Sequence, residues 1–282
     1  MATGTPAAPQ PAGGARLTIL SLLGSQLDEL GGELWLATLL ALLAPLGLSE
    51  SAARAQLQRM AAAGWFEVDR IGRHSRYRLT GRARDELRSG DRRVLETSEP
   101  TEPGWDGTWT VVCYEIDEGR RTSRDRLRAE LQWLGFGALQ AGVWISPGRL
   151  GPAAHALRTR LGLRNRVQVA EGATFPADEH AALVRRCWDL EAITHRWEAV
   201  DRLLDAADGP PAGDEAAYVA DQALLAGLLD ALRADPNLPE ALLPPSWSGT
   251  AVRRRVEARR AALRPAVRRH VQAVLAATSP AS

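Results

Sequence analysis

The order of helix and strand signals between residues 33 and 80 constrains the fold more than any other feature. The stretch ATLLALLAPLG is predicted to be an apolar helix that ends at Gly47, because proline and glycine stop a helix. Ser49 then holds an N-cap position before a second helix, ESAARAQLQRMAAAG. Strand-forming residues follow on both sides of a turn at Gly72. Two helices joined by a short turn and followed by a hairpin are therefore predicted.

This segment belongs to a small domain that we place at residues 15–90. An apolar helical band precedes it, and a glycine pair at 31–32 ends that band. The stretch ELWL is compatible with a short strand, and a last short helix, GRARDELRS, follows the hairpin. Helix, strand, helix, helix and hairpin is the order of a winged helix-turn-helix, in which the second helix of the pair enters the major groove of DNA.

The predicted hairpin concentrates positive charge. Residues 66–84 contain six arginines and two acids, a sum of 6 − 2 = +4, whereas the whole chain of 282 residues has a formal net charge of +1. Side chains alternate along a strand, so Tyr77 is expected to face the core while Arg76 and Arg78 face outward. The planar guanidinium group pairs well with phosphate. An outer row of arginines along a phosphate backbone is therefore expected.

The helix before the hairpin carries side chains suited to base edges. Arginine pairs with guanine and glutamine with adenine in the major groove, and a short side chain allows close approach of the backbone. The alternative is an ordinary solvated helix face. The predicted DNA-binding residues are Ser51, Arg54, Gln56, Gln58 and Arg59 on the helix, and Arg70, Arg73, His74, Arg76 and Arg78 on the hairpin.

Two further domains are predicted after a polar linker at residues 91–104. Residues 104–172 have the order β-α-β-β-α-β, which is that of a ferredoxin-like domain. Residues 176–278 have helical periodicity throughout, interrupted by the breakers GPPAGD and PNLPEALLPPSWSG. The predicted fold class is therefore α+β.

Composition places the chain among ordinary globular proteins, with 45% hydrophobic and 24% charged residues. Its start, MATGTPAAPQPAGG, lacks the basic and apolar regions of a signal peptide and is predicted to be a disordered tail. No apolar run has the length of a membrane span, so a cytoplasmic protein is expected. Cys113 and Cys187 are expected to be buried free thiols. The histidines have no metal-ligand spacing, and neither a metal nor a cofactor is predicted.

Three motifs resemble those of the PaaX family of bacterial repressors, which is named for phenylacetate degradation. The first is GGELWLATLLALLAPLGLSESAARAQLQRMAAAGWF followed by GRHSRYRLTGRAR. The second is WDGTWTVVCYEI with RRTSRDRLRAELQWLGFGALQAGVWISP, and the third is DPNLPEALLPPSWSG. They occur in the family's order, and the resemblance extends from Leu17 to about Val274.

The resemblance implies a homodimeric regulator with a winged helix, a middle domain similar to Cas2 and a helical C-terminal domain. It implies binding to promoter DNA, repression of an operon for aromatic-acid catabolism, and release by an aryl-CoA thioester, phenylacetyl-CoA. The family's recognition-helix arginines fall on Arg54 and Arg59. Whether this chain represses or activates, and which operator it binds, stays open.

A CoA thioester effector would need cations beside an apolar slot for its acyl group. Arg120, Arg121 and Arg124 stand at the start of a predicted helix, where the positive helix end also favours phosphate. A second candidate wall is made of Arg185, Arg186 and Trp188. Ordinary surface arginines are the alternative for both groups.

Two other functions compete with DNA binding. Cas2-like nucleases carry an aspartate after a tyrosine at the end of the first strand, where this chain has Glu115 after Tyr114 and Asp117 two residues later. A lone carboxylate of this kind is a poor metal site. In the other alternative, the helical tail and the nine tryptophans serve protein assembly. Four of these, Trp109, Trp133, Trp144 and Trp188, are instead expected in the core.

Overall fold

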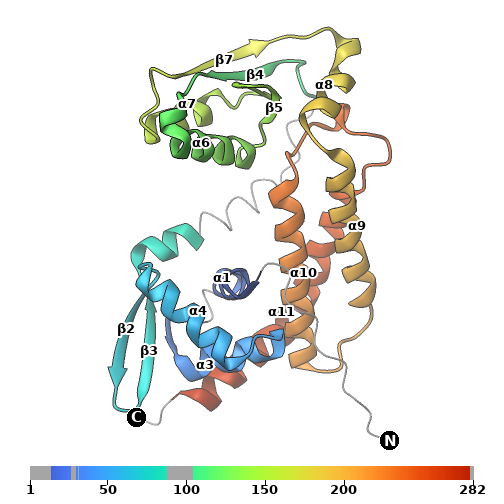
Figure 1. Ribbon diagram of the computed structural model, residues 1–282. Coiled ribbons are helices and arrows are strands. Elements are labelled where there is room, and N and C mark those ends of the chain that lie inside the picture. Colours follow the sequence, from blue (N-terminus) through green and yellow to red (C-terminus); the bar gives the residue numbers. More distant parts are fainter. Residues whose placement is uncertain (1–13, 27–29, 31, 88–103, 280–282) are drawn as a thin grey trace, which may run out of the picture. The chain divides into compact units, whose positions relative to one another are not determined.

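The computed structural model describes residues 14–26, 30, 32–87 and 104–279 and divides the chain into two compact units (Figure 1). Unit 1 comprises the described parts of residues 1–96, 198–229 and 250–282, and unit 2 those of 97–197 and 230–249. The helical segment predicted as a third domain, residues 176–278, contributes to both units. Helices and two antiparallel sheets occur together, which confirms the α+β class.

Unit 1 begins with helices and a three-stranded sheet. The elements are α1 (Gly14–Ser25), β1 (Glu33–Trp35), α3 (Leu36–Leu43), the 3-10 turn η1 (Ala44–Leu46), α4 (Glu50–Ala62), β2 (Phe66–Ile71) and β3 (His74–Leu79). Residues 81–87 are also helical. The sheet order is β1-β3-β2, with both pairs antiparallel.

Local chemistry explains where these elements stop and start. Gly47 follows η1 in the left-handed conformation, with φ 79°, which glycine adopts without strain. The hydroxyl of Ser49 accepts a hydrogen bond from the backbone N–H of Ala52 at 3.3 Å and caps α4. Gly72, with φ 60°, opens the two-residue loop between β2 and β3. Tyr77 is buried, as the alternation along β3 predicts.

Three long helices complete the chain: α9 (Leu190–Ala206), α10 (Asp214–Ala234) and α11 (Gly249–Thr278). In unit 1, the buried hydroxyl of Tyr218 on α10 donates a hydrogen bond to the carbonyl oxygen of Leu42 on α3, at 2.8 Å. Thr38 on α3 and Thr278 on α11 join hydroxyls at 2.7 Å. Helices α10 and α11 are therefore anchored to α3, the first helix of the α3–α4 pair.

Unit 2 contains the predicted β-α-β-β-α-β segment. Its elements are β4 (Trp109–Tyr114), η2 (Glu118–Arg120), α6 (Arg121–Trp133), β5 (Gly137–Gln140), β6 (Val143–Pro147), α7 (Gly151–Arg160), β7 (Val167–Ala173), η3 (Ala177–Glu179), α8 (His180–Cys187) and η4 (Glu240–Leu242). The four strands form an antiparallel sheet in the order β5-β6-β4-β7.

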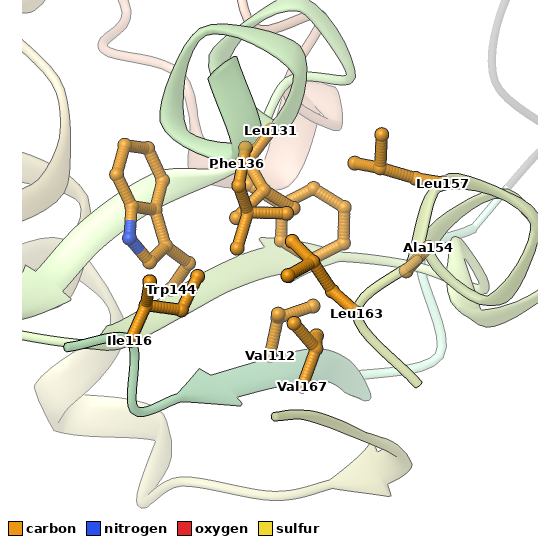
Figure 2. Close-up of a cluster of buried hydrophobic side chains, with 10 residues drawn as sticks. Val112, Ile116, Leu131, Phe136, Trp144, Ala154, Leu157, Leu163 and Val167 are labelled. Atoms are coloured by element: carbon orange, nitrogen blue, oxygen red, sulfur yellow. The ribbon is translucent and has the colours of Figure 1, made fainter. Parts of the chain in front are cut away.

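The sheet of unit 2 is buried on both faces. Figure 2 shows the core between the sheet and helices α6 and α7, in which Val112 and Trp144 are cross-strand partners. A second core contains Trp109, Ile145 and Trp188, with residues of α8 and η4. Neighbouring residues of one strand point to opposite faces, so the near-continuous apolar run of β4 serves both cores.

Two expectations from the sequence were wrong. Trp133 is 44% exposed, because α6 packs through Leu127 and Leu131, and a residue two positions further lies on the opposite side of the helix. Cys113 is exposed, since it lies near the end of β4, and Cys187 is half-buried. Burial raises the pKa of the Cys187 thiol to about 11.

No helix in the described part of the chain is long and apolar enough to span a membrane.

Candidate nucleic-acid interface

The exposed face of α4 carries most of the residues expected to contact bases. The helix packs against unit 1 through a buried face, and the opposite face is open to solvent. The buried residues are Ala53, Gln56, Leu57 and Met60, and the exposed residues include Ser51, Arg54, Gln58 and Arg59. The spacing of three and four residues on each face is that of an amphipathic helix.

Arg54 is held loosely on this exposed face. Its Nη2 lies 2.7 Å from Oε1 of Glu50, one helical turn earlier, and its Nε donates to the same oxygen at 2.8 Å. Both side chains are about half exposed or more. Exposed pairs of this kind contribute only ~0–1 kcal/mol, so the guanidinium group is able to leave Glu50 for another acceptor.

Gln56 does not face solvent as the sequence prediction required. It is only 9% exposed, and its Oε1 accepts hydrogen bonds from Nε and Nη2 of Arg59 at 3.2 and 2.7 Å. Gln56 shares its helix face with Ala53 and Met60, and that face packs inward. In this structure it orients Arg59 rather than presenting its amide to a ligand.

The outer face of the sheet in unit 1 is an ion-pair network. Arg78 donates from Nε, Nη1 and Nη2 to Glu33, Glu67 and Asp69 at 2.9, 2.9 and 2.8 Å. Arg76 lies 3.1 Å from Asp69 and 3.4 Å from Glu33. Two arginines and three carboxylates sum to 2 − 3 = −1 on this face. Arg76 and Arg78, which were expected to bind phosphates, are therefore already paired with carboxylates of the same sheet.

The tip of the β2–β3 hairpin is different. Arg70, Arg73 and His74 are exposed there, and neither arginine forms an ion pair with any residue in the described part of the chain. Ile71 and Val68 are 45% and 43% exposed. The uncompensated charge of the hairpin thus lies at its tip, beside apolar side chains.

The two arginine groups expected to bind an effector lie in different surroundings. Arg120 and Arg121 are exposed, whereas Arg124 lines a cavity of about 500 Å³ together with Arg128, which the sequence analysis did not single out. Arginines four residues apart on a predicted amphipathic helix were the signal that could have found it. Arg120 and Arg121 do not line this cavity.

The second group does not form a wall. Arg185 and Arg186 are exposed on α8. Trp188 is 9% exposed and stacks on Trp109, with ring centroids 6.4 Å apart, inside the second core. Its role is packing, and the two arginines lack the aromatic partner that the sequence interpretation gave them.

The carboxylates at the end of β4 do not gather into a metal site. Asp117 accepts a hydrogen bond from Nη1 of Arg166 at 2.7 Å. Across the described residues, no group of three or more His, Cys, Asp or Glu side chains is placed to hold a metal ion.

Three protein-family models match the chain in order along the sequence. Residues 14–83 match the model described as PaaX-like protein, and residues 102–184 match that of the PaaX protein central Cas2-like domain. Residues 188–273 match the PaaX-like protein C-terminal domain. The matches cover the segment from α1 to β3, the sheet of unit 2 and most of the three C-terminal helices.

Two proteins are similar to this chain over most of its length. The chain is 33% identical over 255 residues to the transcriptional repressor PaaX of Escherichia coli (strain K12), covering 86% of this chain and 78% of that protein. A solved structure, the uncharacterized protein Rv0674 from Mycobacterium tuberculosis, superposes with a TM-score of 0.58 at 27% sequence identity. That likeness covers 92% of this chain and 99% of the other.

Proposed function

The chain belongs to the PaaX family, and from this premise we propose that it is a DNA-binding transcriptional regulator. In this proposal the N-terminal part of unit 1 is a winged helix-turn-helix, and the sheet of unit 2 is a ferredoxin-like domain. The protein acts as a homodimer on promoter DNA, represses a catabolic operon of the aromatic-acid type, and is released by an acyl-CoA or similar small effector.

The observation that carries the proposal is the placement of α4. It follows α3 after a short turn, its apolar face is buried, and Ser51, Arg54 and Gln58 stand together on the exposed face. A B-DNA major groove, about 12 Å wide, admits an α-helix. Arg54 is suited to the O6 and N7 atoms of guanine and Gln58 to adenine, since both pairings are bidentate.

The hairpin supports the same placement through its tip. Arg70 and Arg73 have no carboxylate partner in the described residues, so they are available to phosphates, while Ile71 offers an apolar contact. Phosphate contacts orient a protein on the duplex, and base contacts give sequence preference. We therefore assign orientation to the hairpin tip and sequence preference to α4.

A homodimer sets the spacing of the operator. Two copies of α4 related by a two-fold axis would enter successive major grooves on one side of the duplex, about 34 Å apart. The expected operator is a pseudopalindrome with half-sites one helical turn apart. A footprint of a single half-site would contradict the dimer.

The proposal is tested by titrating the full chain onto a fluorescently labelled duplex from the promoter of its own gene. A scrambled duplex of equal length and composition is the control, and both are measured at several salt concentrations, because counterion release alone makes binding salt-dependent. Tighter binding to the promoter supports the proposal. Equal binding to both duplexes at every salt concentration, also with other promoters of the locus, would refute it.

The release step has its own measurement. Phenylacetyl-CoA is added to the preformed complex at fixed salt, with coenzyme A alone as the control. Loss of promoter binding with the thioester only would support an aryl-CoA effector. Unchanged binding would leave the regulator in place and remove that effector from the proposal.

A further inference from the structure

A cavity of about 500 Å³ opens in unit 2 between α6 and the ends of β4, β5 and β6. Its volume falls within the range of about 300–1,000 Å³ that is usual for small-molecule sites. It is lined by residues of β4, α6, β5 and β6 and of the segments that follow β4 and β5: Tyr114, Glu115, Ile116, Arg124, Arg128, Ala138, Gln140, Ala141, Gly142 and Trp144.

The charged groups of the cavity favour an anion. Arg124 and Arg128 lie four residues apart on α6 and so share one face of the helix. Arg128 is exposed and forms no ion pair with any residue that the structure describes. Glu115 is the single acid among the described lining residues, beside the two arginines. Two forked cations beside one carboxylate can bind an acidic group bidentately.

An indole donor without a hydrogen-bond partner in the described residues also lines this cavity. Trp144 is only 2% exposed and lines the cavity, but its indole N–H forms no hydrogen bond with any described residue. In Figure 2 its ring lies at the edge of the core, with the nitrogen on the side away from Leu131 and Phe136. This nitrogen is not among the buried side-chain atoms without a partner, so it is accessible and can donate to a ligand oxygen.

The apolar wall of the cavity is preformed. Ala138 and Trp144 are cross-strand partners on β5 and β6. Ile116 packs in the core that contains Trp144. Gly142, at φ 72°, closes the wall, because a Cβ atom there would lie 2.5 Å from the carbonyl oxygen of Tyr114. The turn can therefore approach β4 this closely only with glycine, and this contact fixes the backbone on that side of the cavity.

We propose that this cavity is the effector site and that it takes an organic anion joined to a flat apolar group. The acidic group is bound between Arg124 and Arg128, and the apolar group lies against Ile116, Ala138 and Trp144. The inference rests on the proposed function only in treating the ligand as an effector. Binding itself is independent of DNA and is tested without it.

The test is isothermal titration calorimetry of the full chain with 2-naphthoate, a flat aromatic carboxylate. We expect one saturable site per chain, and weaker binding of 2-naphthamide, which has the same shape without the charge. Arg128→Gln should weaken naphthoate binding by about tenfold or more, because bonds to charged groups are worth ~1.5–3 kcal/mol. Arg126→Gln is the matched control, since Arg126 is exposed on the same helix and does not line the cavity.

A second variant fills the cavity from an exposed position of β5. Ala138 is exposed and lines the cavity, so Ala138→Trp should abolish binding while the far-UV circular dichroism spectrum and urea midpoint stay unchanged. Absence of saturable naphthoate binding to the unmodified chain would overturn the proposal. Equal affinities in the Arg128→Gln and Arg126→Gln variants, or binding that survives Ala138→Trp, would also overturn it.

Competition and DNA release complete the test. Displacement of naphthoate by phenylacetate alone assigns a free carboxylate, displacement by phenylacetyl-CoA alone assigns the phosphates of the thioester, and displacement by neither overturns the proposal. If the displacing ligand weakens promoter binding in the Arg126→Gln variant but not in Arg128→Gln, the effector role is supported. Naphthoate binding without any change in promoter affinity overturns that role, whereas failure of promoter binding itself refutes the proposed function and not the cavity.

Discussion

Arg78 on β3 donates from Nε to Oε1 of Glu33 on β1 at 2.9 Å, and the same guanidinium group reaches Glu67 and Asp69 on β2. The hydrogen bond with Glu33 is the main cause of the raised pKa of Arg78. One arginine thus connects all three strands of the sheet in unit 1. Arg78 therefore contributes to the stability of that sheet, and its positive charge is compensated by carboxylates of the same face.

From this network we predict that Arg78→Ala lowers the urea midpoint of the protein, because three carboxylates then face one another with Arg76 alone between them. Arg73→Ala at the hairpin tip should leave the midpoint unchanged, since Arg73 is exposed and has no ion pair in the described residues. Unfolding followed by circular dichroism compares the two. Equal midpoints would show that the network does not hold the sheet together.

The same pair of variants separates stability from DNA binding. Arg73→Ala should weaken binding to promoter and scrambled duplexes alike and reduce the slope of log K against log salt by about one, as expected for one lost phosphate contact. Arg78→Ala should change that slope less, because three carboxylates already compensate the positive charge of Arg78 in the free protein. Fluorescence anisotropy at four salt concentrations gives both slopes. A larger slope change for Arg78→Ala would place the phosphate backbone on the sheet face instead of the hairpin tip.

On α4 we predict that Arg54→Ala costs ~1–3 kcal/mol of promoter binding, about ten- to a hundredfold, and leaves scrambled-duplex binding little changed. The matched control is Arg254→Ala, which removes an exposed arginine of α11. Thr278 is the residue of α11 that is bonded to Thr38 on α3. Arg254 lies 278 − 254 = 24 residues earlier on α11, which places it about 36 Å along the helix from that bond. If both variants bind the promoter as the unmodified chain does, α4 is not the recognition helix.

The order of elements could be predicted from the sequence because each boundary has a local chemical cause. Ser49 caps α4, Gly47 and Gly72 adopt positive φ, and Tyr77 alternates into the core. These signals act within a few residues of the boundary that they fix. Local chemistry therefore predicts the elements well even though it contains nothing about their partners.

The fate of the hairpin arginines was only partly predictable. The two-residue loop after Ile71 sets the register that places Glu67 opposite Arg78 and Asp69 opposite Arg76. Those two pairs could have been found from the turn. Glu33 could not, since it reaches the network through the pairing of β1 with β3, which joins residues 45 positions apart.

The errors at Gln56 and Trp133 have another origin. Helical periodicity shows which residues share a face, but it does not show which face the neighbouring elements cover. Gln56 falls on the same face as Leu57 and Met60, and Trp133 falls opposite Leu131. Gln56 was expected to be exposed because it is polar, and Trp133 was expected to be buried because it is aromatic. In both cases the position on the helix determined the burial instead.

The bond between α10 and α3 leads to a further prediction, that Tyr218→Phe destabilises the protein by ~1–3 kcal/mol. The variant keeps the ring, which stacks on His270 with centroids 4.9 Å apart, and leaves the carbonyl of Leu42 without its donor. Tyr114→Phe is the control, because the Tyr114 hydroxyl has no hydrogen-bond partner in the described residues. Urea unfolding at pH 7 compares them. A midpoint for Tyr218→Phe equal to that of Tyr114→Phe would mean that the bond contributes nothing.

A pH dependence follows from the first turn of α10. Arg269 donates to both oxygens of Asp214 at 3.0 and 2.7 Å, and this hydrogen bonding lowers the pKa of Asp214 from its usual 3.8. A carboxyl group with a lowered folded-state pKa stabilises the fold above pH 3.8 and loses that contribution as pH falls through the lowered value. Asp214→Asn should therefore lower the urea midpoint at pH 7 and have a shrinking effect below pH 3.8.

The control for that prediction is Glu215→Gln. Glu215 stands in the same first turn of α10, so it has the same relation to the helix dipole, but it forms no ion pair with a described residue. Its substitution should move the midpoint less than Asp214→Asn at pH 7. An equal effect of both variants would assign the stabilisation to the helix dipole and remove Arg269 from the explanation.

The two thiols should react with a disulfide reagent at very different rates. Cys113 is exposed, whereas burial raises the pKa of Cys187 to about 11, so that only about one molecule in a thousand carries its thiolate at pH 8. In the native protein, 5,5′-dithiobis(2-nitrobenzoate) should modify one thiol per chain rapidly, and both of the two cysteines after unfolding in urea. Cys113→Ser should abolish the rapid phase, because the reagent needs the thiolate and Cys187 supplies almost none. Two equally rapid thiols in the native chain would show that Cys187 is far more accessible than its packing beside Trp188 allows.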